Sequence, residues 1–226
     1  MMGMWLLLLV LAVTAFGGEL EKARDAQDRA GLEKQIKSLS DAAGKASKDA
    51  NAQYQVALAN SYLAEIAIEQ RNKNLAKSAA VAGMDAAKKA LALKGDSAEY
   101  HRILGTLCGQ TVPANVLLGI QYGKCALEEV NRAIEMDPKS AMGYLSRGVG
   151  NYYLPPQFGG GIDKAIADFQ KVIGMDPKLA DAHLWLGVAL RKANRNAEAR
   201  KAFEQSLKLN PNRVWAKQQL EKTPAQ

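Results

Sequence analysis

The polar and apolar positions of the chain divide it into two end segments and a long central part. Residues 18–50 are polar and rich in alanine, with a thin apolar stripe at helical spacing, which predicts one or two capping helices. We expect breaks at Gly44 and at residues 49–51. Residues 212–226 have few apolar positions and a polar tail, which predicts a short solvating helix over the last unit. The apolar stripe of the first segment consists of Leu20, Leu32, Ile36 and Leu39.

Over residues 51–211 one arrangement of large and small residues recurs. A large residue is followed four positions later by a glycine, then by an alanine and a second large residue, and the unit ends at a proline. Three copies are clear, in residues 98–138, 141–177 and 180–211, and a degenerate copy occupies residues 51–96. The clear copies carry His101, Gly105, Ala126, Val130 and Pro138; Tyr144, Gly148, Ala165, Phe169 and Pro177; and His183, Gly187, Ala199, Phe203 and Pro211.

The glycine and the alanine of each unit predict a pair of closely packed antiparallel helices. A small side chain lets one helix approach the other, while the large residues fill the remaining space. Proline lacks a backbone N–H and disfavours helical geometry in the residue before it, so the proline of each unit ends the second helix. Each pair leaves one face apolar, and the pairs must therefore stack on one another.

This pattern resembles the tetratricopeptide-repeat family, and the resemblance covers roughly residues 50–220. It implies an all-α fold, a right-handed superhelix of antiparallel helix pairs with a concave groove. The second and third copies contain extra residues between the glycine and the alanine, so we expect an irregular array with lengthened helices and loops. The consecutive prolines and glycines of residues 155–161 predict a loop. The apolar segment 112–118 is expected to fold onto the array.

In this family, partners bind along the exposed side of the first helix of each unit. Carrying those positions over gives a mixed groove with an apolar, aromatic centre and basic ends, which suits a protein or peptide partner. For Tyr152 and Tyr153, the alternative is that one of them packs in the core against the proline loop. The groove positions are Asn60, Arg102, Thr106, Gln110, Leu145, Val149, Tyr152, Tyr153, Leu184, Val188, Arg191 and Lys192.

The positive charge of the chain is concentrated near its C-terminal end. The formal net charge is +7, and residues 178–226 carry 10 basic and 4 acidic side chains. We interpret this stretch as a solvated helical face, with an attractive surface for an acidic partner or anionic lipids as the alternative. No nucleic-acid partner is expected. The basic residues include Arg191, Lys192, Arg195, Arg200, Lys201, Lys208, Arg213 and Lys217.

Residues 1–17 have the pattern of a secretory signal peptide. The apolar run at residues 5–13 is shorter than the roughly 20 residues that span a membrane. Ala15 and Gly17 are small residues at the spacing that signal peptidase needs. An uncleaved anchor is the alternative, and it is the only membrane contact that we expect. The chain is therefore predicted to be periplasmic or secreted, and its insert at residues 152–161 resembles that of exported bacterial tetratricopeptide proteins of unassigned role.

The residue types required for catalysis form no recognisable constellation in the sequence. No glycine-rich phosphate loop follows a strand pattern, and His101 and His183 occupy the aromatic position of a repeat. Their spacing to Cys108 and Cys125 does not suit a metal site. We therefore expect no enzyme, no cofactor and no metal. Both cysteines lie near the contact between the helices of one repeat, and two states stay open: a disulfide if the chain is exported, or two reduced buried thiols.

These features favour a non-catalytic scaffold that binds a protein or peptide in the concave groove. One alternative is an accessory subunit of a solute transporter, in which the apolar segment 112–118 lines a cavity for a small ligand. The other is a protein that binds anionic surfaces through its basic C-terminal part. Co-purification of a small ligand would favour the first alternative, and steep salt dependence of binding would favour the second.

Overall fold

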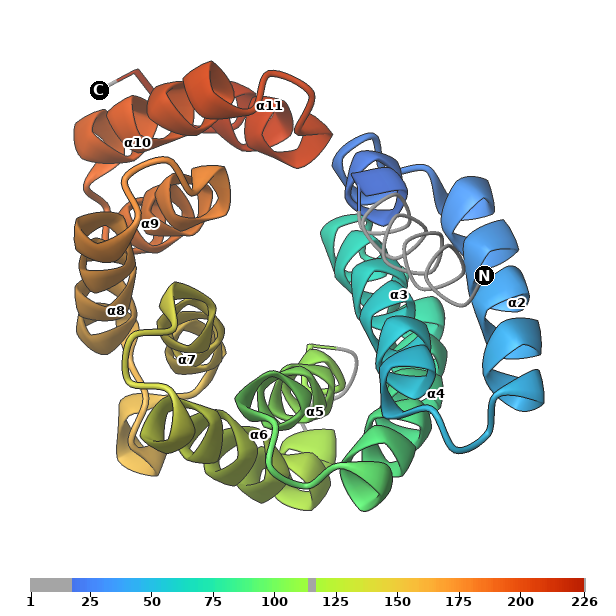
Figure 1. Cartoon of the computed structure of the whole chain (residues 1–226). Helices are drawn as coiled ribbons and strands as arrows, with labels where there is room; N and C mark the ends of the chain where they lie inside the picture. Colours follow the sequence, from blue (N-terminus) through green and yellow to red (C-terminus); the bar gives the residue numbers. More distant parts are fainter. Residues whose placement is uncertain (1–17, 114–116, 226) are drawn as a thin grey trace.

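The computed structural model describes residues 18–113 and 117–225, and these form helices joined by short turns, without a strand (Figure 1). None of the helices in this part of the chain combines the length and the hydrophobicity that crossing a membrane requires. The predicted leader, residues 1–17, lies outside the described residues. A helical segment at residues 18–25 is followed by α2 (Arg29–Lys45), α3 (Ala50–Glu69), α4 (Lys73–Leu93), α5 (Ala98–Gln110), α6 (Leu117–Met136), α7 (Ala141–Tyr153), a 3-10 turn (Pro156–Phe158), α8 (Ile162–Met175), α9 (Ala180–Lys192), α10 (Asn196–Leu209) and α11 (Val214–Glu221).

Side-chain caps begin several helices, and prolines follow the ends of others. Oδ1 of Asp49 accepts hydrogen bonds from the backbone N–H groups of Asn51 and Ala52, at 2.9 and 3.2 Å, at the start of α3. The hydroxyls of Ser97 and Ser140 cap α5 and α7. α6, α8 and α10 each end two residues before the proline of their repeat, as predicted.

The close contact between paired helices that the glycines predicted is present. A Cβ atom at Gly148 would lie 2.5 Å from Cε1 of Phe169, and one at Gly187 would lie 2.6 Å from Cε1 of Phe203. Both distances are far inside van der Waals contact, so only glycine fits these positions without displacing the ring. The alanine four residues before each phenylalanine is fully buried. The large and small residues of the repeat therefore form one interlocking contact.

The array is irregular, as the sequence indicated. α3 and α4 have 20 and 21 residues, whereas α7 to α10 have 13 or 14. α2 ends one residue after Gly44, and α7 ends before the predicted proline loop. In that loop Gly159 and Gly161 have φ values of 89° and 117°, which only glycine adopts readily. These two residues return the chain to the start of α8.

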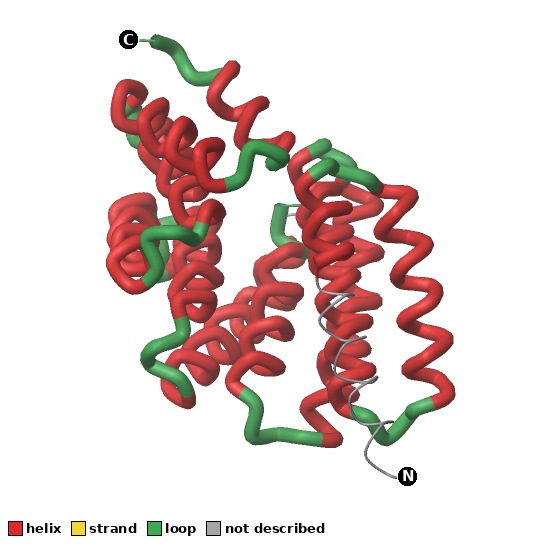
Figure 2. Tube along the Cα trace, turned by 45° about the horizontal axis from the view of Figure 1, so that its top comes forward, coloured by secondary structure: helices red, strands yellow, loops and turns green. Residues whose placement is uncertain are grey.

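The array curves until its last unit meets its first. In Figure 1, α11 lies beside the helical segment 18–25, and Figure 2 shows the C-terminal helices next to the N-terminal bundle from a second direction. Side chains 144 to 191 positions apart in the sequence are hydrogen bonded at this junction. The superhelix is thus a closed ring, with α3, α5, α7 and α9 on its inner side (Figure 1).

Candidate functional site

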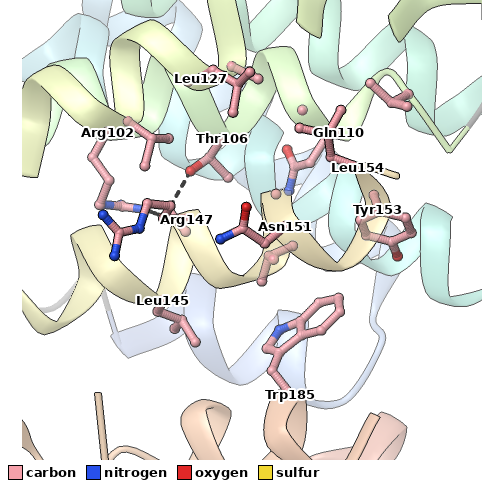
Figure 3. A pocket seen from close by; sticks show the side chains of 18 of the residues that line it. Arg102, Thr106, Gln110, Leu127, Leu145, Arg147, Asn151, Tyr153, Leu154 and Trp185 are labelled. Atoms are coloured by element: carbon pink, nitrogen blue, oxygen red, sulfur yellow. Dashed lines mark hydrogen bonds between the residues drawn. The ribbon is translucent and has the colours of Figure 1, made fainter. Parts of the chain in front are cut away.

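A cavity of about 1070 Å³ lies inside the ring. Residues of α3, α5, α6 and α7 form most of its wall, and the segment 18–25, the loop after α7, α8, α9 and α11 contribute the rest. Much of the wall is apolar, and two tryptophans belong to it: Trp185 from α9 (Figure 3) and Trp215 from α11, whose rings lie 5.1 Å apart. Three apolar lining residues are exposed to solvent, namely Leu127, Met142 and Phe158. A largely apolar enclosure of this size is the usual form of a binding site.

The structure brings the predicted groove positions of the second and third repeats together in this cavity. α5 and α7 stand side by side on the inner side of the ring, and their predicted faces point to the same space (Figure 3). Val112 and Pro113 also line the cavity, although residues 114–116 of the apolar segment lie outside the described residues. The predicted positions that line the cavity are Arg102, Thr106, Gln110, Leu145, Val149 and Tyr153.

The predicted groove positions of the last repeat are wrong. Leu184 and Val188 are buried in the second hydrophobic core and do not reach the cavity. Arg191 donates hydrogen bonds to the backbone oxygen and to the side-chain oxygen of Gln219, which lies in α11. The physical reason is that α11 packs over α9 where an open groove would continue. Asp181 and Trp185 are the residues of α9 that line the cavity instead.

Three further predicted groove positions, Asn60, Tyr152 and Lys192, make contacts within the protein and do not line the cavity. Asn60 is buried, and its Nδ2 donates to the backbone oxygen of Val56 at 2.9 Å. Nζ of Lys192 donates to the backbone oxygen of Tyr152 at 3.0 Å and lies 4.3 Å from the centre of that ring. Tyr152 itself packs edge-on against Tyr153 and does not line the cavity. Of the two tyrosines, only Tyr153 belongs to the cavity wall.

A polar group that sequence reasoning missed crosses the wall between α7 and α8. Arg147 donates to both carboxylate oxygens of Asp168, at 3.0 and 2.6 Å, and Nδ2 of Asn151 donates to the same carboxylate at 2.9 Å. All three residues line the cavity. The signal was visible, because Arg147 and Asn151 stand where the repeat pattern has leucine and an aromatic residue. A polar side chain at a core position needs a buried partner, and Asp168 supplies it.

A second polar group joins α3, α5 and α7. Arg102 donates to Glu99 at 2.7 Å through Nε and at 2.5 Å through Nη2, and its Nη1 donates to Ser146 at 3.2 Å. The hydroxyl of Tyr54 donates to the same Glu99 at 2.7 Å. Burial alone would raise the pKa of Glu99, but the hydrogen bonds from Arg102 and Tyr54 hold it below its ordinary value. Glu99 is therefore ionised, and every guanidinium nitrogen of Arg102 is in use.

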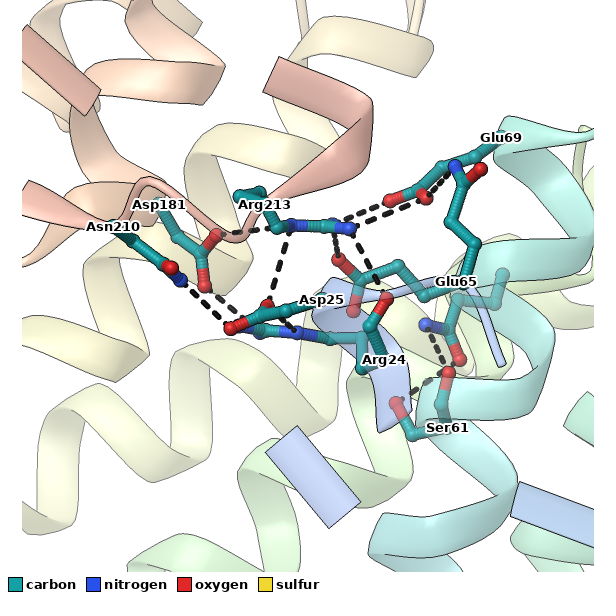
Figure 4. A network of polar contacts seen from close by, with 10 residues as sticks. Arg24, Asp25, Ser61, Glu65, Glu69, Asp181, Asn210 and Arg213 are labelled. Atoms are coloured by element: carbon teal, nitrogen blue, oxygen red, sulfur yellow. Dashed lines mark hydrogen bonds and ion pairs between the residues drawn. The ribbon is translucent and has the colours of Figure 1, made fainter. Parts of the chain in front are cut away.

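The ring is closed by a buried ion network, which also forms one end of the cavity (Figure 4). Arg213, whose side chain is 0% exposed, donates to Glu65 at 2.7 Å and to both oxygens of Glu69. Arg24 donates to Asp181 at 2.8 Å and to Asp25 at 2.7 Å. The network unites the N-terminal segment, α3, α9 and the turn before α11.

The carboxylates of this network differ in their pKa. Burial raises the pKa of Glu69 to about 7, because the loss of hydration outweighs the attraction of Arg213. Burial also raises the pKa of Glu65, against the attraction of Arg24 and Arg213. For Asp181, by contrast, the two guanidiniums outweigh burial and lower the pKa. The network therefore contains one carboxylate, that of Glu69, that takes up a proton near neutral pH.

The prediction of a solvated basic face at the C-terminal end is wrong for part of this stretch. Arg213 is fully buried among carboxylates, and Arg200 donates to the backbone oxygens of Leu220 and Thr223 at 3.2 and 2.7 Å. Arg195 is paired with Glu198 on the surface. From the sequence alone, all of these side chains were treated as exposed charges. In the structure, several of them instead bind other parts of the protein and hold its C-terminal end in place.

The two cysteines are bonded to each other. The Cα atoms of Cys108 and Cys125 lie 6.0 Å apart, and the disulfide links α5 to α6. Among the described residues, no group of three or more histidine, cysteine, aspartate or glutamate side chains is arranged to hold a metal ion. His101 pairs with Glu129, with 2.6 Å between Nδ1 and Oε2, and Nε2 of His183 lies 3.0 Å from the backbone oxygen of Pro177.

Comparisons with known proteins show which families the chain matches. The family model "Regulator of microtubule dynamics protein 1-3" matches residues 20–154, and a tetratricopeptide-repeat model matches residues 158–214. A search of curated protein sequences finds no match. Proteins built from such repeats are generally non-catalytic scaffolds for protein–protein interaction, and the chain has this fold.

Several solved structures are similar to this chain at low sequence identity, and one of them, TTC0263, has a TM-score above 0.5. TTC0263, a tetratricopeptide-repeat protein of Thermus thermophilus, is 16% identical, with a TM-score of 0.63 over 91% of this chain and 99% of that chain. YrrB is 19% identical, with a TM-score of 0.45 over 90% and 96% of the two chains. MamA of Desulfovibrio magneticus RS-1 is 19% identical, with a TM-score of 0.45 over 89% and 96%. The first family model covers more than half of the chain, so the chain, a tetratricopeptide-repeat protein, belongs to the family of regulators of microtubule dynamics 1-3.

Proposed function

We propose that the chain is a non-catalytic binding protein that takes an apolar segment of a partner protein or peptide into the cavity of the ring. The observation that carries the proposal is the cavity itself, about 1070 Å³ in volume and lined by six of the positions predicted to contact a partner. Exposed apolar residues at its edge, Leu127, Met142 and Phe158, would continue the contact outside the cavity.

The polar residues of the wall support a binding role in preference to a catalytic one. Arg102, Arg147 and Asp168 are held in internal ion pairs, and Gln110 donates to the backbone oxygen of Ser61 at 3.1 Å. Such fixed groups orient a ligand, because a bound segment meets a rigid pattern of charges and amides. The apolar surface between them supplies the free energy of binding.

A small apolar ligand is the second candidate occupant. The volume of the cavity is at the upper end of the range of about 300–1,000 Å³ that is typical of small-molecule sites. The two candidates share the same cavity and differ in what co-purifies with the protein.

Two helical glycines allow a test with a matched control. Gly150 lines the cavity in α7, and a Cβ atom there would meet no atom within 4 Å, so Gly150→Trp starts a side chain in open space and places its indole in the cavity. Gly174 in α8 is equally free of neighbours but is exposed and does not line the cavity. Gly174→Trp therefore adds the same side chain to the outside of the ring.

The three proteins, wild type and both variants, are purified from cells after cross-linking, and bound proteins and small molecules are identified by mass spectrometry. We expect the bound partner or ligand with the wild type and Gly174→Trp, and its loss with Gly150→Trp. Equal capture by all three proteins would show that the cavity is not the binding site.

We also propose that the protein is exported to an oxidising compartment, the periplasm in a bacterial cell. The apolar run at residues 5–13 and the small residues Ala15 and Gly17 support this proposal, and so does the bond between Cys108 and Cys125. Intact-mass analysis of the chain expressed with its own leader tests it. A mass that matches the full chain with two free thiols would contradict export.

A further inference from the structure

The end of the cavity at the ring junction has an excess of negative charge. Four carboxylates, Asp25, Glu65, Glu69 and Asp181, face only two guanidiniums, those of Arg24 and Arg213. With all six groups ionised, the formal charge of the network is −2. Glu65, Glu69, Asp181 and Arg24 line the cavity, so this charge faces the enclosed space. Charge buried in this way requires neutralisation by protons or by a bound cation.

Two acceptor atoms in the cavity wall, Oε2 of Glu65 and Oδ1 of Asn151, are unused within the described part of the chain. Glu65 binds Arg213 through Oε1, and Oε2 has no partner among the described residues. Asn151 is 8% exposed and donates through Nδ2, while its Oδ1 points into the cavity without a partner in this part of the chain (Figure 3). The guanidiniums of Arg24 and Arg102 use all their nitrogens within the protein. A ligand that donates hydrogen bonds can therefore bind at Glu65 and Asn151.

Aromatic rings surround the acidic end. Arg24 lies over the ring of Tyr62 at 5.1 Å from its centre, and Arg213 lies over Trp215 at 5.7 Å. Tyr153 lines the same cavity as Glu65 and Glu69. The faces of such rings attract cations, and the attraction grows when water is excluded. The walls thus favour a cation that also carries apolar surface.

We infer that the acidic end of the cavity binds an organic cation, an ammonium or guanidinium group on an apolar body. The cation binds at the free Oε2 of Glu65, and its apolar body lies against Tyr62, Trp185 and Trp215. A basic side chain of a partner protein and a free amine share this chemistry. The inference rests on the proposed binding role of the cavity and specifies what the cavity prefers.

A pair of probes with the same shape tests the inference. Phenethylammonium carries the cation, and 2-phenylethanol replaces the ammonium with a neutral hydroxyl. Their affinities for the full chain are measured by calorimetry at pH 8, where Glu69 is largely ionised. We expect phenethylammonium to bind at least about tenfold more tightly, because its charged ammonium forms an ion pair with the carboxylate that the neutral hydroxyl cannot form.

Glu65→Gln locates the site. The amide keeps an acceptor for Arg213 and removes the charge, so we expect the preference for phenethylammonium to fall to less than about twofold while 2-phenylethanol binds as before. Glu69→Gln provides a second variant with the same loss of charge. Unchanged binding of 2-phenylethanol shows that each variant is folded. If the preference for phenethylammonium persists in both variants, the cation does not bind at the acidic end of the cavity.

The outcomes separate this inference from the proposed function. If 2-phenylethanol binds and phenethylammonium binds no more tightly, the cation site is wrong and the cavity still binds apolar ligands. If neither probe binds, or if both bind equally well to Gly150→Trp and Gly174→Trp, the cavity is not the binding site and both proposals fail. The source of the natural cation follows from whether a peptide or a free amine co-purifies.

Discussion

Arg213 follows Glu69 by 144 positions in the sequence, yet its guanidinium donates to both oxygens of that carboxylate. The contact joins the turn before the last helix to the first helix pair, and it converts an open superhelix into a ring. Arg213 is fully buried, and among the described residues its charge is balanced by the carboxylates of the junction. Opening of the ring would break these ion pairs and expose the guanidinium and the carboxylates to water.

Replacement of Arg213 tests how much the junction contributes to stability. In Arg213→Ala the carboxylates of Glu65 and Glu69 stay buried without their partner, and we expect the free energy of unfolding to fall by about 3–5 kcal/mol. Urea denaturation measures the loss, and small-angle scattering shows whether the ring opens. Arg195 forms an exposed pair with Glu198, and Arg195→Ala should leave the free energy of unfolding nearly unchanged. Equal losses in the two variants would contradict the closing role of Arg213.

The pKa of Glu69 predicts how stability depends on pH. The folded-state pKa of about 7 lies above the ordinary value of 4.5, so the folded protein binds a proton that the unfolded chain releases. The stabilisation is complete below about pH 4.5 and is lost as the pH rises towards 7. We expect Glu69 to lower the free energy of unfolding by up to about 3 kcal/mol between pH 5 and pH 7.5.

Comparison with Glu69→Gln isolates this contribution. The amide cannot titrate, so the difference in the free energy of unfolding between wild type and variant should change across pH 5 to 7.5. Titrating groups outside the junction network are common to both proteins and cancel in the difference. A difference that is constant over this range would show that Glu69 does not bind a proton in the folded state.

The repeat fold could be predicted because its determinants are local. Gly148 and Phe169, and likewise Gly187 and Phe203, belong to the same helix pair, so their spacing is visible in a short stretch of sequence. For the same reason, most of the positions that were predicted for the groove in α5 and α7 line one cavity, since both helices keep the register of the repeat. Within one helix pair, sequence spacing and spatial contact nearly coincide.

The closed ring could not be predicted, because it depends on pairs such as Arg24 with Asp181, which are 157 positions apart. The sequence pattern contains no signal for such a pair, and Arg213 was therefore counted as surface charge. Leu184 and Val188 were assigned to the groove for a related reason: the covering position of α11 depends on how the whole array curves. The curvature follows from the sum of small rotations between repeats.

The contact between Gly148 and Phe169 predicts a clear effect of a single methyl group. In Gly148→Ala the added Cβ would lie 2.5 Å from the ring of Phe169, so either the helices separate or the ring moves. We expect a loss of about 1–3 kcal/mol in the free energy of unfolding. Gly174→Ala adds the same methyl group in open space and should stabilise α8 by up to about 1 kcal/mol. Rescue of Gly148→Ala by Phe169→Leu, measured by urea denaturation, would show that the clash is the cause.

The disulfide offers a test of the compartment and of the second repeat together. Cys108 and Cys125 close a loop with a sequence separation of 17, for which the chain-entropy model gives about 3 kcal/mol of stabilisation. Addition of a reducing agent should therefore destabilise the wild type by about this amount and leave Cys108→Ala/Cys125→Ala unchanged. Alanine is the suitable replacement because Cys108 is buried among apolar groups, where a serine hydroxyl would lack a partner. If the wild-type protein is insensitive to reductant and its mass shows two free thiols, the second repeat folds without the disulfide. The disulfide would then no longer support export.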